Sequence, residues 1–390
     1  MCGTAPGLST PPPLSLYIHI PWCVRKCPYC DFNSHEARGN VPEAEYVAAL
    51  VKDLEVALPL VWGRKVVSVF FGGGTPSLLS ARAVDEILTA VRTLLPLEAL
   101  AEITLEANPG TAEAQKFADF RSAGVNRLSL GIQSFNPRHL QLLGRIHDDI
   151  EARRAVELAQ RHFDNINLDL MYALPEQSMA EMQADLRTAI GFAPQHLSAY
   201  HLTLEPNTQF YLAPPSLADD DTAAEMQLAV EAELAGAGYE HYETSGFAQK
   251  GRRCQHNLNY WSFGDYLGIG AGAHGKLTQH DRVLRQMRYK QPKAYLENAS
   301  RGAPVQEERV VGAADLGFEF MMNAMRLTDG FPLALFQART GLSLAGVLGS
   351  LEEAERRGLV KMDLLQVRPT ELGRRFLNEL LQMFLPDDDA

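Results

Sequence analysis

Three cysteines lie within eight residues of one another near the start of the chain. Cys23, Cys27 and Cys30 follow the apolar run Leu14 to Ile20, and Pro28 falls between the last two. Because a proline lacks the N–H that a helix interior needs, the three thiols must converge from a loop. Three thiolates can hold three irons of a [4Fe–4S] cluster and leave the fourth iron open to another ligand. The segment therefore predicts a cluster with an open coordination site.

Zinc and a disulfide are the alternative explanations of these cysteines. Structural zinc takes four ligands, commonly from two Cys-x2-Cys pairs, whereas this segment offers one such pair and a third cysteine. A zinc site would need His19, His35 or the distant Cys254 as its fourth ligand. Five cysteines in 390 residues are too sparse for a disulfide framework. Arg25 and Lys26 favour thiolates by their charge, and the cysteines alone leave zinc open beside an iron–sulfur cluster.

The composition favours a large, acidic protein with a substantial core. The 390 residues exceed one typical domain, although α/β barrels run long as single units, so we expect one barrel with an appended module. The hydrophobic content is 46% and the net charge is −12, which opposes a broad nucleic-acid-binding surface. No run approaches eighteen apolar residues, and the first twenty residues lack the pattern of a signal peptide. We therefore expect a cytoplasmic protein with no integral membrane segment and no nucleic-acid partner.

Apolar, β-branched runs alternate with amphipathic helical segments over residues 1–240. From Ala81 to Leu95 the apolar residues recur on one helical face, and the last helix of this region is Thr222 to Ala235. Repeated strand–helix units predict a parallel sheet with right-handed crossovers, and six units predict an α/β fold with an incomplete (β/α)6 TIM-like barrel. The predicted strands are Leu14 to Ile20, Val66 to Phe71, Glu102 to Leu105, Arg127 to Ile132, Asn165 to Met171 and His196 to Leu202.

The regular alternation ends before residue 307. We expect residues 241–306 to form a connecting segment and residues 307–390 to form a helix-rich C-terminal module that acts as a lid or a partner-docking surface. The predicted helices of this module are Ala313 to Met325, Pro332 to Thr340, Leu344 to Arg357 and Glu371 to Phe384, with a hairpin over Val360 to Val367.

Polar or glycine-rich positions follow each of the six predicted strands. Because the carboxyl ends of parallel strands meet at one edge of a barrel, these positions predict a single site. Beside the cysteine loop they are Gly72 to Pro76, Glu106, Asn108, Gln133, Ser134, Asp169, Tyr200, His201 and Glu205. The glycine triplet lacks the Lys-Ser/Thr of a nucleotide P-loop, so it indicates close approach of a ligand to the backbone.

The Cys-x3-Cys-x2-Cys spacing resembles the signature of the radical S-adenosylmethionine (SAM) superfamily. The resemblance extends over nearly the whole chain, which is similar to the coproporphyrinogen-oxidase branch of the superfamily. It rests on the segments Leu-Tyr-Ile-His-Ile-Pro-Trp-Cys, Phe-Phe-Gly-Gly-Gly-Thr-Pro-Ser, Leu-Glu-Ala-Asn-Pro, Leu-Gly-Ile-Gln-Ser-Phe and Asn-Leu-Asp-Leu-Met-Tyr-Ala-Leu-Pro. It implies a radical SAM barrel, a [4Fe–4S] cluster on the three cysteines, SAM on the open iron, and a winged-helix-like C-terminal module. In that superfamily, one-electron reduction can cleave SAM to a 5′-deoxyadenosyl radical.

The resemblance also implies eight SAM contacts, carried over motif by motif. They are Tyr17 beside the cluster, Gly73, Gly74 and Thr75 at the methionine amino group, Glu106 at the polar portion, Gln133 and Asp169 at the ribose hydroxyls, and Arg145 at the carboxylate. An amide and a carboxylate suit hydroxyl groups, and a guanidinium matches a carboxylate. Without the resemblance, Arg145 would be expected at a solvated helix end and Asp169 at a helix cap.

Three features distinguish branches of this family. The oxygen-independent coproporphyrinogen III oxidases have a fourth cysteine where this chain has Phe32, and they carry a long N-terminal extension. In contrast, His256 to Trp261 matches the His-Asn-x-x-Tyr-Trp signature of the HemW-type haem chaperones. Imidazole is a standard ligand of haem iron, and Tyr and Trp offer flat apolar surface to a porphyrin. His256 is therefore the candidate haem ligand, with His201, His241 and His274 as alternatives, and Cys254 is expected to be a buried, inert thiol.

The resemblance implies a haem chaperone that delivers haem as cargo to acceptor apoproteins, such as those of the respiratory chain. An electron donor such as a flavodoxin or a ferredoxin is the further partner that it implies. The first alternative is an oxygen-independent coproporphyrinogen III oxidase, and the second is a radical SAM enzyme that modifies RNA. The sequence leaves open whether the protein is an enzyme that turns SAM over.

Overall fold

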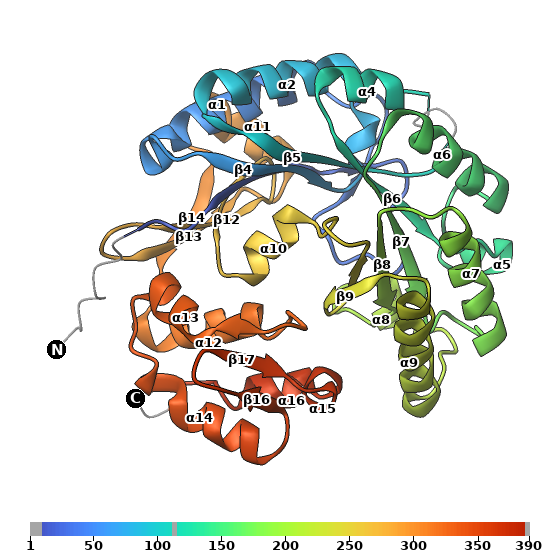
Figure 1. Ribbon diagram of the computed structural model, residues 1–390. Coiled ribbons are helices and arrows are strands. Elements are labelled where there is room, and N and C mark those ends of the chain that lie inside the picture. The colour runs from blue at the N-terminus through green and yellow to red at the C-terminus, as the bar shows by residue number, and fades with distance from the viewer. Residues whose placement is uncertain (1–9, 111–114, 387–390) are drawn as a thin grey trace.

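A mixed sheet forms the centre of the computed structural model, which describes residues 10–110 and 115–386 (Figure 1). Its described part has twelve strands in the order β14-β13-β12-β11-β1-β4-β5-β6-β7-β8-β10-β9. Six neighbouring strands run parallel: β1 (Leu14–Ile20), β4 (Val66–Gly73), β5 (Leu97–Ala107), β6 (Arg127–Gln133), β7 (Ile166–Tyr172) and β8 (His196–His201). They curl into an open barrel, which confirms the predicted incomplete α/β barrel.

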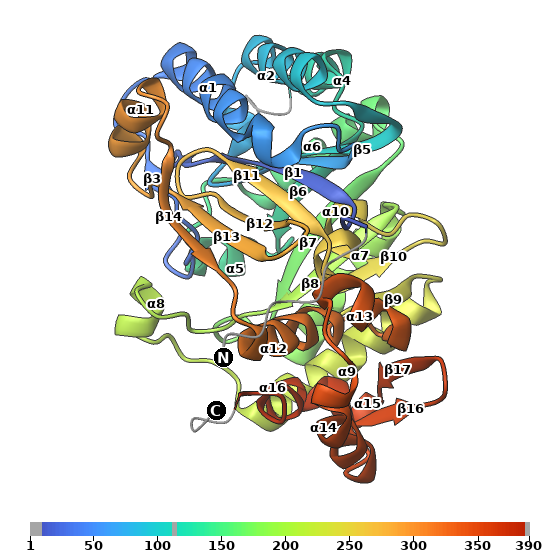
Figure 2. The same cartoon turned by 90° about the vertical axis from the view of Figure 1, so that its left-hand side faces the viewer.

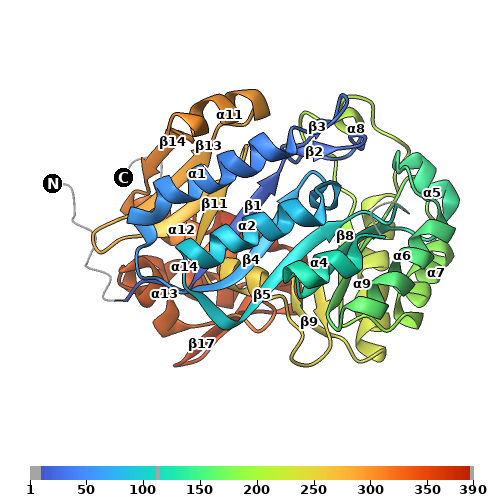
Figure 3. The same ribbon diagram turned by 90° about the horizontal axis from the view of Figure 1, so that it is seen from above.

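Helices cover the convex face of this sheet. They are α1 (Glu43–Val61), α2 (Ala81–Leu94), α4 (Phe117–Ala123), α6 (Asp149–His162), α7 (Met179–Gly191), α9 (Asp220–Gly236) and α11 (Pro292–Ser300). Shorter helical turns are η1 (Pro76–Leu78), α5 (Pro137–Leu142) and α8 (Gln209–Leu212). Seen from above, α1, α2 and α4 lie side by side across the strands (Figure 3).

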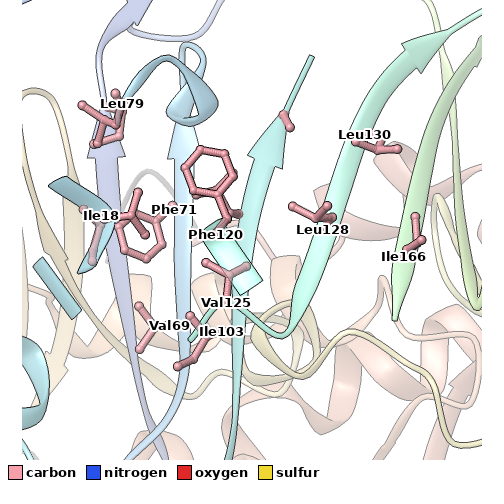
Figure 4. Packing of buried hydrophobic residues seen from close by; sticks show 14 of the residues in the cluster. Ile18, Val69, Phe71, Leu79, Ile103, Phe120, Val125, Leu128, Leu130 and Ile166 are labelled. Atoms are coloured by element: carbon pink, nitrogen blue, oxygen red, sulfur yellow. The ribbon is translucent and has the colours of Figure 1, made fainter. Parts of the chain in front are cut away.

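Local sequence signals explain where these helices begin. Ser80 caps α2 by accepting a hydrogen bond from the backbone N–H of Ala83, and the predicted apolar face of α2 is buried. Helices α6 and α7 begin with capping boxes, in which Asp148 pairs with Glu151 and Ser178 pairs with Glu181. The apolar faces pack on the strands to form the main core (Figure 4), which includes Ile18, Val69, Phe71, Leu79, Ile103, Phe120, Val125, Leu128, Leu130 and Ile166.

Residues 241–306 extend the sheet at both ends, which the sequence analysis did not predict. The added strands are β9 (Glu240–Glu243), β10 (Gly246–Ala248), β11 (Asp265–Ile269), β12 (His274–Thr278), β13 (Val283–Arg288) and β14 (Val305–Val310). Strand β11 pairs in parallel with β1. It contains a charged residue and a glycine, which obscure a strand pattern. Asp265 is nevertheless buried, because Lys276 Nζ and Arg64 Nη1 each lie 2.8 Å from its carboxylate.

The C-terminal module has a second hydrophobic core, to which Phe263 and Val283 of the preceding segment also contribute. It lies beyond helix α10 (Gln255–Trp261), which occupies the concave side of the sheet (Figure 2). Its elements are α12 (Ala313–Ala324), β15 (Phe331–Pro332), α13 (Leu333–Thr340), α14 (Ala345–Arg356), β16 (Val360–Met362), β17 (Gln366–Pro369), α15 (Glu371–Arg375) and α16 (Leu377–Gln382). The predicted hairpin is confirmed by the antiparallel pairing of β16 and β17. The single helix predicted from Glu371 is wrong, because Phe376 leaves helical geometry with φ −107° and ψ 45°. Among the described residues, no helix is both long and apolar enough to cross a membrane.

Candidate functional site

The three cysteines of the signature line one pocket at the carboxyl ends of the parallel strands. Cys23 ends β2 (Trp22–Cys23), which pairs with β3 (His35–Glu36), and the other two lie in the intervening loop. The pocket has a volume of about 330 Å³ and is called the cysteine pocket below. All three thiols are free, and the backbone N–H of Cys30 donates to the carbonyl of Cys27 at 3.2 Å. Burial raises the pKa of Cys23 and of Cys30.

The candidate fourth ligands of a zinc site have other neighbours. His19 Nε2 lies 2.9 Å from the carbonyl oxygen of Asn33, and Cys254 Sγ lies 3.4 Å from Glu102 Oε1, away from the pocket. His35 shares a surface hollow with Cys27 and Cys30. Within residues 10–110 and 115–386, no three His, Cys, Asp or Glu side chains are grouped to hold a single metal ion. In a [4Fe–4S] cluster each thiolate binds a different iron, so such grouping around one position is not required.

The glycine turn after β4 abuts the cysteine loop. The backbone N–H of Gly74 donates to the carbonyl of Ile20, and that of Thr75 donates to the carbonyl of Trp22, both at 2.8 Å. A Cβ atom at Gly74 would come within 2.5 Å of the carbonyl oxygen of Trp22 and 3.1 Å of Cys23 Sγ. Gly73 has φ 116°, a conformation that glycine adopts without strain. The glycines therefore allow this turn to approach the loop that carries the cysteines.

Glu106 and Asp169 are two of the carboxyl groups that line the cysteine pocket. Glu106 Oε2 accepts a hydrogen bond of 3.3 Å from the backbone N–H of Gly73. Its burial, and next the nearby Asp169, raise the pKa of Glu106 to about 8. Asp169 lies within β7 and accepts hydrogen bonds from Ser129 Oγ at 3.1 Å and Asn167 Nδ2 at 2.8 Å. Asp169 therefore lies in a strand and not at a helix cap.

Arg145 brings its guanidinium group to the same wall from the loop after α5. Its Nη2 donates to Asn108 Oδ1 at 2.5 Å and to the carbonyl of Gly131 at 2.7 Å, while Nη1 lies 3.7 Å from Cys27 Sγ. A Cβ atom at Gly131 would lie within 3.4 Å of Gln133, Asn108 and Arg145, so the glycine lets these three side chains meet. The side chain of Arg145 is therefore not at a solvated helix end.

Asn108 and Gly131 also line the cysteine pocket, although the sequence assigned them no contact with SAM. The sequence feature that could have indicated them is their position, since each lies at the carboxyl end of a parallel strand. Gln133 ends β6 with φ 68°, which turns the chain sharply at the pocket.

Tyr17 faces a second cavity on the concave side of the sheet. This α10 cavity has a volume of about 250 Å³, and it shares Glu106, Ser129, Asp169 and Tyr200 with the cysteine pocket. Tyr17, Phe70, Arg127, Asn167, Ser198, Cys254, His256, Asn257, Tyr260 and Trp261 complete its lining. The two cavities therefore adjoin each other within the barrel.

Glu102 on β5 positions the helix that carries the His-Asn-x-x-Tyr-Trp motif. Its Oε1 accepts hydrogen bonds from the backbone N–H of Gln255 at 3.0 Å and of His256 at 3.4 Å, at the N-terminus of α10. Asn259 Nδ2 donates to Ser15 Oγ at 2.9 Å and to the carbonyl of Asp265 at 2.8 Å. These contacts anchor α10 to strands β5, β1 and β11.

His256 is buried in the wall of the α10 cavity. Its Nδ1 lies 3.1 Å from Ser68 Oγ, and its ring stacks on Phe70 with centroids 4.8 Å apart. Burial, and next the charge of Arg127, lower the pKa of His256 to about 3, so its imidazole is neutral at pH 7. Nε2 has no hydrogen-bond partner among the described residues. Cys254 is buried as expected, and burial raises its pKa to about 12.

The other candidate histidines lie elsewhere. His274 is exposed at the start of β12, and His241 stacks on Phe247 with centroids 4.3 Å apart. His201 lines the cysteine pocket and contacts the ring of Tyr172. The geometry therefore brings one histidine, His256, to the α10 cavity and a different one, His201, to the cysteine pocket.

Comparison with known proteins decides the family. Residues 17–189 match the model of the radical SAM superfamily, and residues 312–376 match the HemN C-terminal domain. "Heme chaperone HemW" of Escherichia coli is 50% identical over 380 residues, which cover 96% of this chain and 99% of that protein. "Heme chaperone HemW" of Haemophilus influenzae is 48% identical over 97% of this chain and 99% of that protein. The chain belongs to the HemW family.

A solved structure shows the same fold as this HemW-family chain. Coproporphyrinogen III oxidase (HemN) from Escherichia coli matches with a TM-score of 0.81 over 96% of this chain and 90% of that one, at 23% identity. The likeness confirms the radical SAM barrel and the C-terminal module as an arrangement of elements. At the position of the oxidases' fourth cysteine, this HemW-family chain exposes Phe32 at the edge of the cysteine pocket.

Proposed function

We propose that this chain is a haem chaperone that binds haem and transfers it to acceptor proteins, such as those of the respiratory chain. One observation carries the proposal: the His-Asn-x-x-Tyr-Trp helix faces a cavity that adjoins the cysteine pocket. The names of the two HemW relatives support it. We expect a cytoplasmic location, because the four described cysteines are free thiols. We also expect an electron donor, such as a flavodoxin or a ferredoxin, as a partner.

The residues of the cysteine pocket suit a [4Fe–4S] cluster with SAM. Cys23, Cys27 and Cys30 would hold the cluster, since they are free thiols lining one pocket beside a glycine turn that a side chain would obstruct. The cluster supplies one-electron chemistry and an open iron. The N–H groups and carboxyl groups of the neighbouring strands supply polar contacts to a bound molecule.

Individual side chains of this pocket have roles that follow from their chemistry. The amide of Gln133 and the carboxylate of Asp169 would bind ribose hydroxyls, and Asn167 and Ser129 hold that carboxylate in place. Arg145 would bind the SAM carboxylate and is oriented by Asn108 and Gly131. Gly73, Gly74 and Thr75 would contact the methionine amino group, and Glu106 would face the polar portion of SAM. Tyr17 would lie on the side of the α10 cavity.

His256 is the proposed haem ligand because its Nε2 is unpartnered and its neutral imidazole can donate to iron. Ser68 orients the ring through Nδ1, as a hydrogen-bonded partner commonly does for a metal-binding histidine. Phe70, Tyr260 and Trp261 offer the flat apolar surface that a porphyrin face requires.

An anaerobic haem titration followed by absorbance tests this proposal. Wild type should show a saturable, shifted Soret band at about one haem per chain, because axial coordination changes the haem spectrum. His256→Ala should alter that band, whereas His162→Ala, which changes an exposed histidine of α6, should not. An unaltered band in His256→Ala would reassign the ligand, and absence of specific binding by wild type would contradict the chaperone function.

The second candidate function is coproporphyrinogen III oxidation, which is favoured by the fold that this chain shares with HemN. If wild type binds no haem, the assay to follow is the conversion of coproporphyrinogen III in the presence of SAM and a reductant. Product formation would establish the oxidase.

A further inference from the structure

Arg127 is a buried cation whose hydrogen-bonding groups have no partner in the described structure. It begins β6, and its side chain is 2% exposed and lines the α10 cavity. Its Nε is a buried atom without a hydrogen bond, and its one ion pair, to Glu102 Oε2, spans 4.0 Å. A guanidinium group has five N–H donors, and burying such donors without hydrogen-bond acceptors costs free energy. Such a group indicates a missing acceptor.

The neighbouring acidic groups do not supply that acceptor. Glu102 uses Oε1 for the N-terminus of α10, and Asp169 accepts hydrogen bonds from Ser129 and Asn167. Glu106 has a pKa of about 8 and is largely protonated at pH 7. The charge of Arg127 therefore remains available to an anionic group that enters the cavity.

The rest of the cavity indicates what carries this anionic group. Trp261 Nε1 is a second buried donor without a partner, and it lines the same cavity. Tyr17, Phe70 and Tyr260 form aromatic walls. The volume of about 250 Å³ is below the roughly 300–1,000 Å³ of pockets that enclose a whole ligand, so part of a larger molecule fits. A carboxylate attached to a flat, conjugated ring matches these donors and these walls.

We propose that Arg127 binds a carboxylate of the porphyrin cargo, a propionate group of haem, inside the α10 cavity. This inference rests on the proposed function. Arg127 then determines which porphyrins the protein accepts, because a porphyrin with esterified propionates leaves the guanidinium buried and unpaired. The planar fork of arginine suits a carboxylate better than the point charge of lysine.

The test compares haem with iron protoporphyrin IX dimethyl ester, which has the same ring and iron but no carboxylates. Wild type should bind haem at least about tenfold more tightly than the ester, as expected for a hydrogen-bonded charge pair. In Arg127→Met the two affinities should converge through a loss of haem affinity, while the Soret position stays unchanged because the proposed iron ligand is His256 and not Arg127. Arg127→Lys should recover part of the preference. Arg154→Met, which changes an exposed arginine of α6, should behave as wild type.

The possible outcomes separate this inference from the proposed function. Equal wild-type affinity for haem and ester would overturn the role of Arg127 and leave the chaperone function standing. Binding of neither compound would overturn both. A SAM titration is the third arm: weaker SAM binding by Arg127→Met with an unchanged preference for haem would assign Arg127 to the SAM carboxylate and overturn the inference. The wild-type comparison needs no variant, so the inference can fail even if Arg127→Met does not fold.

Discussion

Two side chains of the cysteine pocket, those of Arg145 and Asp169, are held in position by neighbouring groups. Arg145 is held by Asn108 and Gly131, and Asp169 is held by Ser129 and Asn167. Removing one of these groups therefore changes the internal hydrogen bonds of the wall and, under the proposed function, a contact to SAM.

Replacing Cys27 tests the proposed cluster ligands. Cys27→Ala should abolish the brown absorbance of the reconstituted protein and lower its iron content from about four per chain, because three thiolates are needed to hold the cluster. Cys254→Ala is the matched control, since Cys254 lies in the α10 cavity. A variant at position 27 that retains four irons would disprove the assignment.

Replacing Asp169 tests the proposed ribose contact. Asp169→Ala should weaken SAM binding by about 1–3 kcal/mol, because hydrogen bonds between a charged group and ribose hydroxyls are lost. Calorimetry on the reconstituted protein measures this difference, with the exposed Asp164→Ala as the control. Unchanged SAM affinity in Asp169→Ala would refute the role.

At the scale of elements, the six parallel strands could be predicted because each is an apolar run that ends in polar residues. Strand β1 matches its predicted bounds, and the others differ by a few residues. Strands β11 to β13 could not be predicted in the same way, because several of their charged residues are buried by pairing with distant partners, and β14 is largely exposed. Arg288 on β13 is an example, since its guanidinium group is 3.0 Å from the carboxylate of Asp53 on α1.

Residues that line the cysteine pocket could be predicted from the sequence where a motif accompanies the end of a strand. Contacts between side chains that depend on the fold could not be predicted. Asn108 was noticed as a polar strand end, but its bond to Arg145 needed the fold. Arg127 gave no signal in the sequence, because an arginine at the start of a strand is ordinarily solvated. In the fold, Arg127 is buried in the cavity that α10 lines on the concave side of the sheet.

Glu102 holds helix α10 to the sheet, which predicts a large effect on stability. Glu102→Ala should lower the free energy of unfolding by about 2–4 kcal/mol, because it removes the cap of α10 and leaves the charge of Arg127 unpaired. Urea unfolding measures the change. Glu98→Ala on the same strand should stay within about 0.5 kcal/mol of wild type, because Glu98 is exposed. Equal effects of the two variants would contradict the role of Glu102.

At the scale of the whole molecule, several histidines are buried in their neutral form. Burial lowers the pKa of His147 and of His256 to about 3, and that of His19 to about 4. In the unfolded chain these groups titrate near 6.5. Between these values the unfolded chain binds protons that the folded chain does not, so stability falls as the pH decreases below about 6.5.

A single variant isolates this effect. Each such histidine should cost about 1.4 kcal/mol of stability at pH 5.5. Between pH 7.5 and pH 5.5, the free energy of unfolding of His147→Gln should therefore decrease by about 1 kcal/mol less than that of wild type. The reason is that glutamine takes up no proton in the unfolded chain. Urea unfolding at both pH values measures the difference. Parallel losses in the two proteins would disprove the contribution of His147.

The C-terminal module packs directly against the motif helix. The guanidinium group of Arg326 lies over the ring of Trp261 at 4.3 Å, and Arg285 of β13 pairs with Glu319 of α12 at 2.7 Å. The module therefore contacts both the rim of the α10 cavity and the added part of the sheet. That it acts as a lid or a docking surface stays a prediction.

The pairing of β1 with β11 has a consequence for synthesis on the ribosome. Leu14 pairs with Asp265, so one edge of β1, an almost wholly buried strand, stays unpaired until a segment about 250 residues later has been synthesised. At cellular rates of translation the wait is roughly 10–50 s. During that time an apolar strand with an open edge is a template for aggregation. The nascent chain should therefore need protection until β11 emerges, although the finished protein has no such requirement.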